Sequence, residues 1–353
     1  MNRLRTYIPL HNRRNSNDDR DHALSPSKRS PPRRRITYLL FTLFGFLALY
    51  LLSHSVPQNH PIRLRTNELA TNVKAAVGAG SKGPDTLVVY VYYDGVRSSG
   101  DPEPTYKGTR PIQNENIEFF LKHGLQSNVD ILFVLNSPLP SNITIPEHYP
   151  NIYVWQKENA CYDLGSFKQG VERMRDVYKK TYIKYLVVNA SVRGPFLPTY
   201  AQHSCWADLF TSRLSSTVKM VGTTYNCDEW FPKHVQSMLL AFDQVGYDAA
   251  IGPMDCPKQL SEAITTGEIR FTDRIHEKGY QVDAVMSAFH GIKDFERVCN
   301  QKDVNFPNLY FGRSLHPYEV VFIKSNRNID DHILAQYTSW HNNMRSRCPY
   351  HIE

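Results

Sequence analysis

Polar residues that could do chemistry gather where apolar runs of the sequence end. The densest such segment is Tyr185–Pro198, where an apolar run meets Asn189, Ser191 and Arg193 before a Gly-Pro break. Asn and Ser supply short hydrogen-bonding groups, and the Arg193 guanidinium supplies a two-pronged donor suited to phosphate or carboxylate. An ordinary polar turn with Arg193 in a surface ion pair would have the same residues, so the segment alone leaves both interpretations open.

A second segment, Glu158–Phe167, carries Asn159 and Asp163 at the start of a predicted helix. The N-terminus of a helix favours polar and negatively charged ligand groups, and an aspartate placed there could bind a substrate or act as a base. The alternative is that Asp163 only caps the helix, which would stabilise it by about 1 kcal/mol.

Three further side chains are weaker candidates. His316, within Tyr310–Lys324, could bind a metal or a phosphate, although a histidine beside a proline is more often a structural residue. Asp283 stands near the end of an expected strand and is a candidate base. Asp94 directly follows the first expected strand.

The elements that must position these residues alternate between apolar runs and helical patterns. Strands are predicted over 86–93, 129–135, 151–156, 182–188, 218–223 and 280–284. Helices are predicted over 114–124, 163–178, 234–244, 261–268 and 272–279. This alternation favours an α/β fold with a mostly parallel sheet between helices. Ligands bind at the carboxyl ends of the strands in such sheets, so most of the candidate residues would share one edge.

The first 56 residues have a different organisation. Residues 1–35 are polar and carry ten Lys or Arg against three Asp, whereas residues 36–56 contain no Asp, Glu, Lys or Arg. A helix of that length spans roughly 31 Å, close to the thickness of the bilayer core. The basic flank predicts a cytosolic tail (1–35), one uncleaved transmembrane signal anchor (36–56) and a type II topology. A stem (57–84) is expected to lead to a lumenal domain (85–353).

The basic charge of the chain belongs to that tail. The formal net charge is +7, and the tail accounts for all of it, so the remaining residues carry as many acidic as basic side chains. A nucleic-acid partner is therefore not expected. The sequence also lacks the phosphate-loop, dinucleotide, nucleophile-elbow and zinc-peptidase motifs.

Cysteines and glycosylation signals agree with a lumenal domain. All six cysteines lie beyond residue 84, and an even count fits up to three disulfides, whose pairing the sequence leaves open. Sequons occur at Asn142 and Asn189. We expect a glycan on Asn142, which lies in a Pro-rich loop. We expect none on Asn189, because a glycan there would block the candidate site.

Two of these segments resemble a known family. The pattern Asn159-x-x-x-Asp163-x-Gly165-x-Phe167, followed by the segment 189–196 (NASVRGPF), is similar to the rhamnan-synthesis-protein-F type of glycosyltransferase and to related eukaryotic type II membrane proteins. The resemblance covers roughly residues 86–324. It implies a GT-A-like fold that binds a nucleotide-sugar donor and transfers the sugar to a glycan or glycoconjugate.

The resemblance also implies roles for the candidate residues. Arg193 would offset phosphate charge, Asn189 and Ser191 would orient hydroxyl groups, and Asp163 would bind the sugar or act as base. The remaining members of the expected site are Asp94, Asn159 and His316 for substrate binding and Asp283 as a second catalytic candidate.

This chain departs from GT-A enzymes in the residues that would bind a divalent metal. Those enzymes usually hold Mn²⁺ or Mg²⁺ with an Asp-x-Asp after a central strand. Here Asn189-Ala190-Ser191 stands in that place, and no Asp-x-Asp occurs in 57–353. Neutral Asn and Ser are weaker ligands for these ions than carboxylates, so the sequence argues against strong metal binding there.

Taken together, the residues predict a glycosyltransferase of the Golgi membrane, with one membrane-spanning helix and a lumenal catalytic domain. A second hypothesis is a non-catalytic lumenal protein that binds glycans or scaffolds other transferases, which the missing Asp-x-Asp favours. A third is another lumenal transferase, such as a sulfotransferase. No Lys/Arg-rich phosphate loop follows the first expected strand to support it.

Overall fold

The computed structural model describes residues 83–95, 112–292, 294–327 and 329–352. The chain divides into the units Met1–Gly78 and Ala79–Glu353, and the described residues belong to the second. The expected tail, the expected anchor and nearly all of the expected stem lie outside the described residues. Within those residues, none of the helices is long and apolar enough to cross a bilayer.

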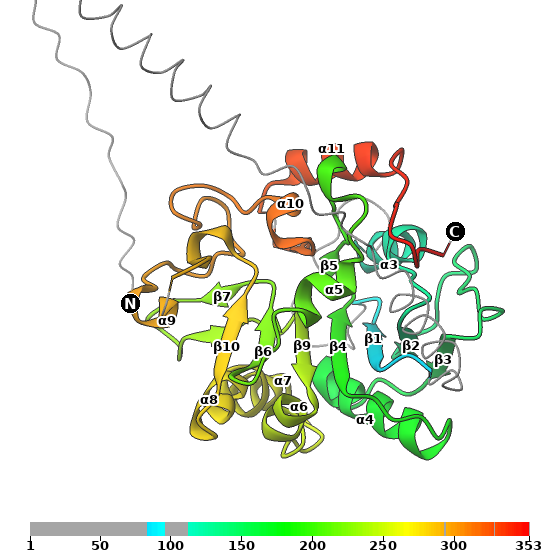
Figure 1. The fold of residues 1–353 in the computed structure, drawn as a ribbon, viewed down its shortest axis with the longest axis horizontal. Helices are drawn as coiled ribbons and strands as arrows, with labels where there is room; N and C mark the ends of the chain where they lie inside the picture. The colour runs from blue at the N-terminus through cyan, green and yellow to red at the C-terminus, as the bar shows by residue number, and fades with distance from the viewer. Residues whose placement is uncertain (1–82, 96–111, 293, 328, 353) are drawn as a thin grey trace, which may run out of the picture. The chain divides into compact units, whose positions relative to one another are not determined.

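A mixed, mostly parallel sheet forms the centre of the fold (Figure 1). Its strand order is β10-β6-β9-β4-β1-β2-β3, and only β9 runs antiparallel to its neighbours. The strands are β1 (Thr86–Tyr92), β2 (Asp130–Leu135), β3 (Ile152–Gln156), β4 (Lys184–Asn189), β6 (Val218–Gly222), β9 (Leu239–Asp243) and β10 (Gln281–Ala284). Every residue of β1 and β2 is buried, as expected for strands covered on both faces.

Helices cover both faces of this sheet, so the predicted α/β architecture is confirmed. Alternate residues of β1 enter two different hydrophobic clusters, which follows from the two-residue period of a strand. One face packs on α4 (Tyr162–Asp176), α6 (Gln244–Ala250) and α8 (Arg270–Glu277). The other packs mainly on α3 (Ile112–His123) and α5 (Trp206–Thr211).

One predicted helix is wrong. Residues 234–244 form β8 (His234–Val235), then β9, and α6 begins only at Gln244. The apolar run of β9 also fits a helical spacing, and short apolar runs do not distinguish a buried strand from a helix. Asp243 ends the strand and caps α6, because its Oδ1 accepts the Gly246 N–H at 2.8 Å.

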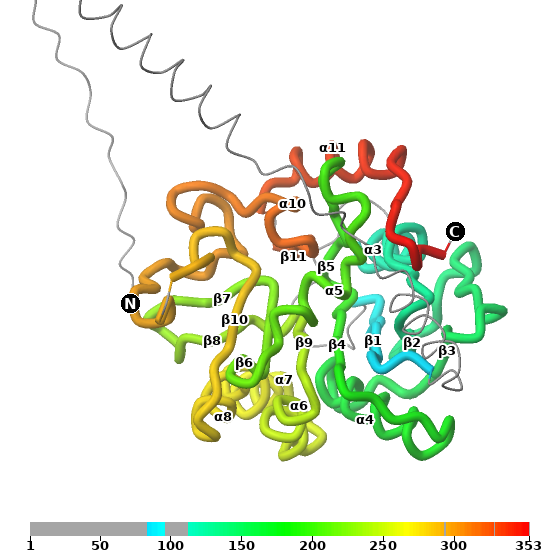
Figure 2. Tube along the Cα trace, viewed as in Figure 1, coloured from blue at the N-terminus to red at the C-terminus, as the bar shows by residue number. Residues whose placement is uncertain are grey.

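Smaller elements extend the carboxyl edge of the sheet. β5 (Val192–Arg193) pairs antiparallel with β11 (Ile323–Lys324), as Figure 2 shows, and β7 (Tyr225–Asn226) pairs with β8. α7 (Leu260–Glu262) continues into a π-helical segment (Ala263–Glu268). The remaining elements are η1 (Thr199–Ala201), η3 (Ser287–Phe289), α9 (Phe295–Val298), α10 (Pro317–Val320) and α11 (Asp331–His341). Toward the top of Figure 1 lie α10 and α11, and toward the bottom lie α4, α6 and α8.

All six cysteines are paired, which confirms the expectation of up to three disulfides. The bridges are Cys161–Cys256, Cys205–Cys348 and Cys227–Cys299. The first joins the start of α4 to the segment before α7, and the second joins the C-terminal segment to α5. Each bridge therefore connects parts of the domain that are distant in sequence.

Candidate functional site

The carboxyl ends of β1, β2 and β4 meet at one edge of the sheet. The Asn136 N–H donates to Tyr92 O at 2.8 Å, and the Ala190 N–H donates to Val91 O at 3.0 Å. These bonds continue the parallel ladders just past the last strand residues. Side chains that follow the three strands are therefore brought side by side.

Asp163 and Asn189, two of the predicted site residues, are in direct contact at this edge. Asn189 Nδ2 donates a hydrogen bond to Asp163 Oδ2, and Asn189 Oδ1 accepts the Ser191 N–H at 2.9 Å. Asp163 lies in the first turn of α4 but does not cap it: the N-cap residue is Cys161, which makes no side-chain cap hydrogen bond. The Asp163 carboxylate therefore turns toward the end of β4.

The loop after β4 is fixed from two other directions. Asn116 Nδ2 donates to Ala190 O and to Ser325 Oγ, both at 2.7 Å. The Ser325 N–H donates to Ser191 O at 3.0 Å. Through these bonds, α3 and the residue after β11 hold the loop in place.

Two charged residues that were not singled out from the sequence join this cluster, Glu268 and Lys324. Burial and the nearby Asp163 carboxylate raise the pKa of Glu268 above its ordinary value, while Lys324 opposes that shift. Burial lowers the pKa of the Lys324 ammonium, and Glu268 opposes that change. Ser237 also hydrogen-bonds the Glu268 carboxyl. Asp163, Asn189, Glu268 and Lys324 are hereafter the edge cluster.

Arg193, predicted as a phosphate ligand, has other partners. Its NH2 group pairs with Glu115 Oε2 at 2.6 Å, its Nε donates to Asn116 Oδ1 at 3.0 Å, and its NH1 donates to Thr338 Oγ1 at 3.2 Å. The side chain is buried. Among the described residues, its hydrogen bonds join β5 to α3 and α11, so the edge cluster is defined without it.

Replacing Arg193 by Met is expected to weaken the fold. The substitution leaves Asn116 Oδ1 without its donor and removes the link to α11, which should cost about 2 kcal/mol of unfolding free energy. Urea denaturation followed by circular dichroism measures this change. Arg175→Met is the matched control, because the Arg175–Asp176 pair is exposed and should contribute nothing measurable. Equal stability of the two variants would contradict this structural role.

Two predicted substrate-binding residues lie nearby without joining the edge cluster directly. Asp94 follows β1, and its N–H donates to Ser137 Oγ at 2.9 Å in the residues that follow β2. Asn159 lies in the exposed loop between β3 and α4. Both are on the carboxyl side of the sheet, and their roles stay predictions.

Asp283 and His316 have partners that account for them structurally. Asp283 pairs with Arg213 Nε at 2.8 Å on β10, the edge strand next to β6. His316 is the N-cap of α10, where its Nδ1 accepts the Tyr318 N–H at 3.2 Å. Its ring lies 4.5 Å from that of Tyr337. Their catalytic and binding roles stay predictions.

The two sequons differ in their surroundings. Asn142 is exposed, and its Nδ2 donates to Glu118 Oε1 at 3.1 Å. The Asn189 amide is engaged with Asp163. A glycan on Asn142 and none on Asn189 therefore remain the expected pattern, which glycopeptide mass mapping would test.

Buried polar atoms without partners accompany the edge cluster. Among the described residues, no hydrogen-bond partner is present for Ser191 Oγ, Thr223 Oγ1 or Asn326 Oδ1. These residues follow β4, β6 and β11, respectively. A buried polar atom left unpaired costs about 1–3 kcal/mol, and such atoms usually have a water, ion or ligand to bind. This edge is therefore chemically suited to a polar ligand.

The residues after β4 do not fit the divalent metal that the resemblance implies. Both polar atoms of the Asn189 side chain are used, one by Asp163 and one by the Ser191 N–H. The described part of the chain contains no group of three or more His, Cys, Asp or Glu that could hold a metal. The Lys324 ammonium adds positive charge to the same place. The residues after β4 therefore do not form a divalent-metal site.

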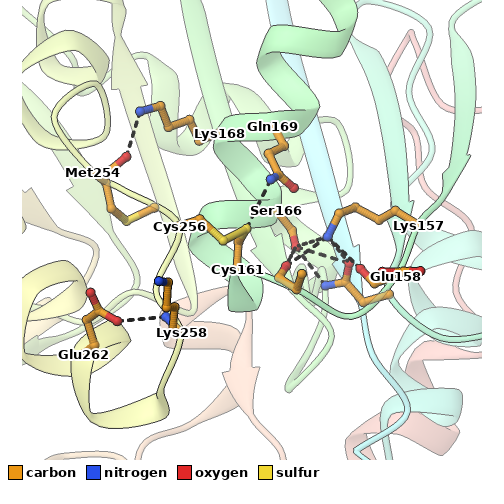
Figure 3. The surroundings of a disulfide bond; sticks show 12 residues. Lys157, Glu158, Cys161, Ser166, Lys168, Gln169, Met254, Cys256, Lys258 and Glu262 are labelled. Carbon is orange, nitrogen blue, oxygen red and sulfur yellow. Dashed lines mark hydrogen bonds between the residues drawn. A yellow bond between two sulfur atoms is a disulfide. The ribbon is translucent and has the colours of Figure 1, made fainter.

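The Cys161–Cys256 disulfide joins the start of α4 to the segment before α7, as Figure 3 shows. The Cys161–Cys256 bridge begins two residues before Asp163, and Lys168 Nζ donates to Met254 O at 2.7 Å next to it. These contacts fasten α4, which carries Asp163, to the segment that leads to Glu268. The bridge therefore helps to fix the position of the Asp163 carboxylate relative to that of Glu268.

Removing the Cys161–Cys256 bridge is expected to impair the site more than removing Cys205–Cys348. Each double Cys→Ala variant should lose about 4 kcal/mol of unfolding free energy, because each bridge closes a long loop. Only the first should also lose its affinity for a nucleotide ligand, measured well below its own melting temperature by calorimetric titration. Equal ligand affinity in the two variants would show that the first bridge has no positioning role.

A second polar network lies at the ends of β2 and β3, also drawn in Figure 3. Lys157 Nζ donates to Asn136 Oδ1 at 3.2 Å and to Ser166 Oγ at 3.3 Å. Burial lowers the pKa of Lys157. Ser166 is on α4, three residues after Asp163, so this network supports the same end of the helix.

A cavity of about 370 Å³ lies at the opposite edge of the sheet. Its lining includes Tyr185 at the start of β4 and Gln244 just after β9. Tyr185 Oη donates to Tyr182 O at 2.8 Å and lies 2.5 Å from Gln244 Oε1. The cavity is thus separate from the carboxyl edge, where the parallel-sheet argument places a ligand.

The chain matches no family model and no curated protein. Among solved structures, it is similar to a mannosyltransferase from Pyrobaculum calidifontis in complex with GDP-Man and Mn²⁺, at 12% identity and a TM-score of 0.34, over 70% of this chain and 64% of that one. It is also similar to a nucleoside-diphosphate-sugar pyrophosphorylase from Vibrio cholerae RC9, at 13% identity and a TM-score of 0.34, over 56% and 91% of the two chains.

A further similar structure is 4-diphosphocytidyl-2C-methyl-D-erythritol synthase from Anaerococcus prevotii, at 14% identity and a TM-score of 0.34, over 62% of this chain and 95% of that one. These structures belong to proteins that handle nucleotide-linked substrates.

Proposed function

We propose that this chain is a glycosyltransferase that takes a sugar from a nucleotide-sugar donor. The single observation that carries the proposal is the edge cluster, in which Asp163, Asn189, Glu268 and Lys324 converge where β4 ends. The carboxyl edge of a mostly parallel sheet is the usual ligand-binding place in such folds. The resemblance of the segments that hold Asp163 and Asn189 to the rhamnan-synthesis-protein-F type supports the same substrate class.

The residues of the cluster suit different parts of the reaction. Asp163 and Asn189, already hydrogen-bonded to each other, would bind hydroxyl groups of the transferred sugar. Glu268, whose pKa is raised by burial and by Asp163, would accept the proton of the acceptor hydroxyl, because a raised pKa makes its carboxylate a stronger base. An acceptor of glycan or glycoconjugate type is proposed because such molecules offer hydroxyl nucleophiles.

The proposed location is the Golgi lumen, with residues 36–56 as a signal anchor. Three disulfides in the described domain support an oxidising compartment. The charge pattern of residues 1–56 supports the type II orientation. Fluorescence microscopy of the tagged full chain, with protease protection of the tag, would test both proposals.

A second function, glycan binding without catalysis, is favoured by the neutral Asn189-Ala190-Ser191 segment. A binding protein would not need a carboxyl group whose pKa is raised, as that of Glu268 is. The position of Glu268 beside Asp163 and Lys324 is better explained by catalysis, because grouped buried charges with shifted pKa values are typical of active sites. Turnover separates the two functions.

The test is a donor panel with the purified full chain in detergent. Uridine, guanosine and cytidine nucleotide sugars are incubated with mixed glycans, and release of free nucleotide is followed by mass spectrometry. We expect release from one donor class above the rate without protein. If no donor is turned over and none raises the melting temperature, the proposed function is wrong.

A further inference from the structure

Lys324 lies on β11, next to the strand that follows the loop after β4. The β5–β11 pairing sets Lys324 opposite Val192, and the neighbouring Ser325 N–H bonds Ser191 O at 3.0 Å. Lys324 is half-buried. In the part of the chain that the structure describes, no hydrogen bond or ion pair reaches its Nζ, and its charge interacts with Glu268 and Asp163 through space.

Arg327 supplies a second cation three residues later. Its guanidinium lies 4.9 Å from the centre of the Phe306 ring, a contact that orients the planar group. Arg327 is exposed, and it is close enough to oppose the charge of Lys324. Two positive groups therefore lie on one short segment, and between them the buried Asn326 Oδ1 has no hydrogen-bond partner among the described residues.

This arrangement favours a doubly charged anion. Lys324 and Arg327 repel each other, and a bound anion would relieve that repulsion. The anion would also take the place of the water that the Lys324 ammonium loses on burial. A lysine provides a compact charge and an arginine a planar fork, and both are common phosphate ligands. The Asn189-Ala190-Ser191 segment, in contrast, offers no charge of either sign.

We propose that Lys324 and Arg327 bind the diphosphate of the nucleotide-sugar donor in place of a divalent metal ion. The proposal rests on the proposed function and specifies how that donor is recognised. In the transfer, the bond between the sugar C1 and the phosphate oxygen breaks, and its electron pair stays on the departing nucleoside diphosphate. The acceptor oxygen bonds to C1 and gives its proton to Glu268. The two cations stabilise the charge that develops on the leaving group.

Binding without metal is tested with nucleoside diphosphates and the full chain in detergent. Melting temperatures and calorimetric titrations are measured with uridine, guanosine and cytidine diphosphates, in EDTA and in Mn²⁺. We expect binding of at least one in EDTA, with a Kd that changes by less than about twofold in Mn²⁺. Lys324→Met should weaken that binding by roughly 10- to 100-fold, the range for a lost charge-assisted hydrogen bond.

Two further variants complete the test. Arg327→Met, at an exposed position, should fold normally and weaken binding by roughly fivefold or more, so the proposal stays testable even if Lys324→Met unfolds. Lys258→Met, an exposed lysine, is the control and should bind as the unaltered chain does. Binding that needs Mn²⁺, or that survives both Lys324→Met and Arg327→Met, would overturn the proposal while leaving donor turnover, and thus the proposed function, intact.

Discussion

Changing Asp163 to asparagine should lower donor turnover by roughly 10²- to 10⁴-fold, the usual range for loss of a positioned catalytic or charge-stabilising group. The substituted amide would keep an oxygen that can accept from Asn189 Nδ2, so the contact between α4 and β4 can persist. What disappears is the negative charge beside Glu268. Initial rates of nucleotide release from the donor identified by the panel measure the effect.

The matched control is Asp176→Asn, an exposed aspartate at the other end of α4 that pairs with Arg175. It should leave turnover unchanged. Loss of the Asp163 charge should also bring the pKa of Glu268 down, because Asp163 is one cause of its elevation. The low-pH limb of the activity profile should therefore move to lower pH in any residual activity. Wild-type turnover by Asp163→Asn would remove Asp163 from the reaction.

Acid should destabilise the domain through a pair of buried histidines, His123 and His341. Their rings lie 4.8 Å apart, and both side chains are buried next to Phe119 and Phe196. Burial lowers the pKa of His123 to about 4 and that of His341 to about 3. Nearby charges lower these pKa values further: Lys122 and His351 for His123, and His123 and Lys122 for His341.

The sign of the effect follows from proton binding. The unfolded chain takes up protons on these histidines below pH 6.5, whereas the folded domain does so only near pH 4 and below. Their contribution to stability is therefore complete above about pH 7 and is lost as pH falls. Between pH 6 and 4.5 the loss should approach about 1.4 kcal/mol per pH unit for each histidine.

Urea denaturation at pH 7.5, 6.5, 5.5 and 5.0 measures this loss, with His341→Phe as the test variant. A phenyl ring keeps the aromatic contacts with Phe119 and Phe196 and cannot be protonated, so the pH dependence should fall by roughly half. The exposed histidine His203 is the control: His203→Phe should keep the full dependence. An unchanged slope in His341→Phe would show that the buried pair does not govern acid stability.

The sequence predicts most of the sheet because β1, β2 and β4 are largely apolar runs that end in or before polar residues. It also predicts that Asp163 and Asn189 lie together, since Asn189 ends one expected strand and Asp163 begins the helix that follows another. It does not predict β9, whose apolar run inserts antiparallel between β4 and β6. Which strands pair with such a run depends on the tertiary fold, and the local spacing of apolar residues does not specify it.

The other half of the site depends on long-range pairing. Lys324 reaches the edge only because β11 pairs with β5, more than a hundred residues earlier. In the sequence, Glu268 looks like an ordinary charged residue near a helix end. Only its neighbours in the fold, such as Asp163 and Lys324, mark it as a site residue. Arg193 has the residue type of a phosphate ligand, but Glu115 and Thr338, from two distant helices, bind its guanidinium.

The most direct test of the central claim is hydrogen–deuterium exchange with the nucleotide sugar that the donor panel identifies. The edge cluster predicts slower exchange on donor binding in peptides that cover 186–193, 263–268 and 323–327. The cavity at the opposite edge, lined by Tyr185 and Gln244, should show no change. Protection confined to the peptides around that cavity, with the three edge segments unchanged, would contradict the assignment of the donor site to the carboxyl edge of the sheet.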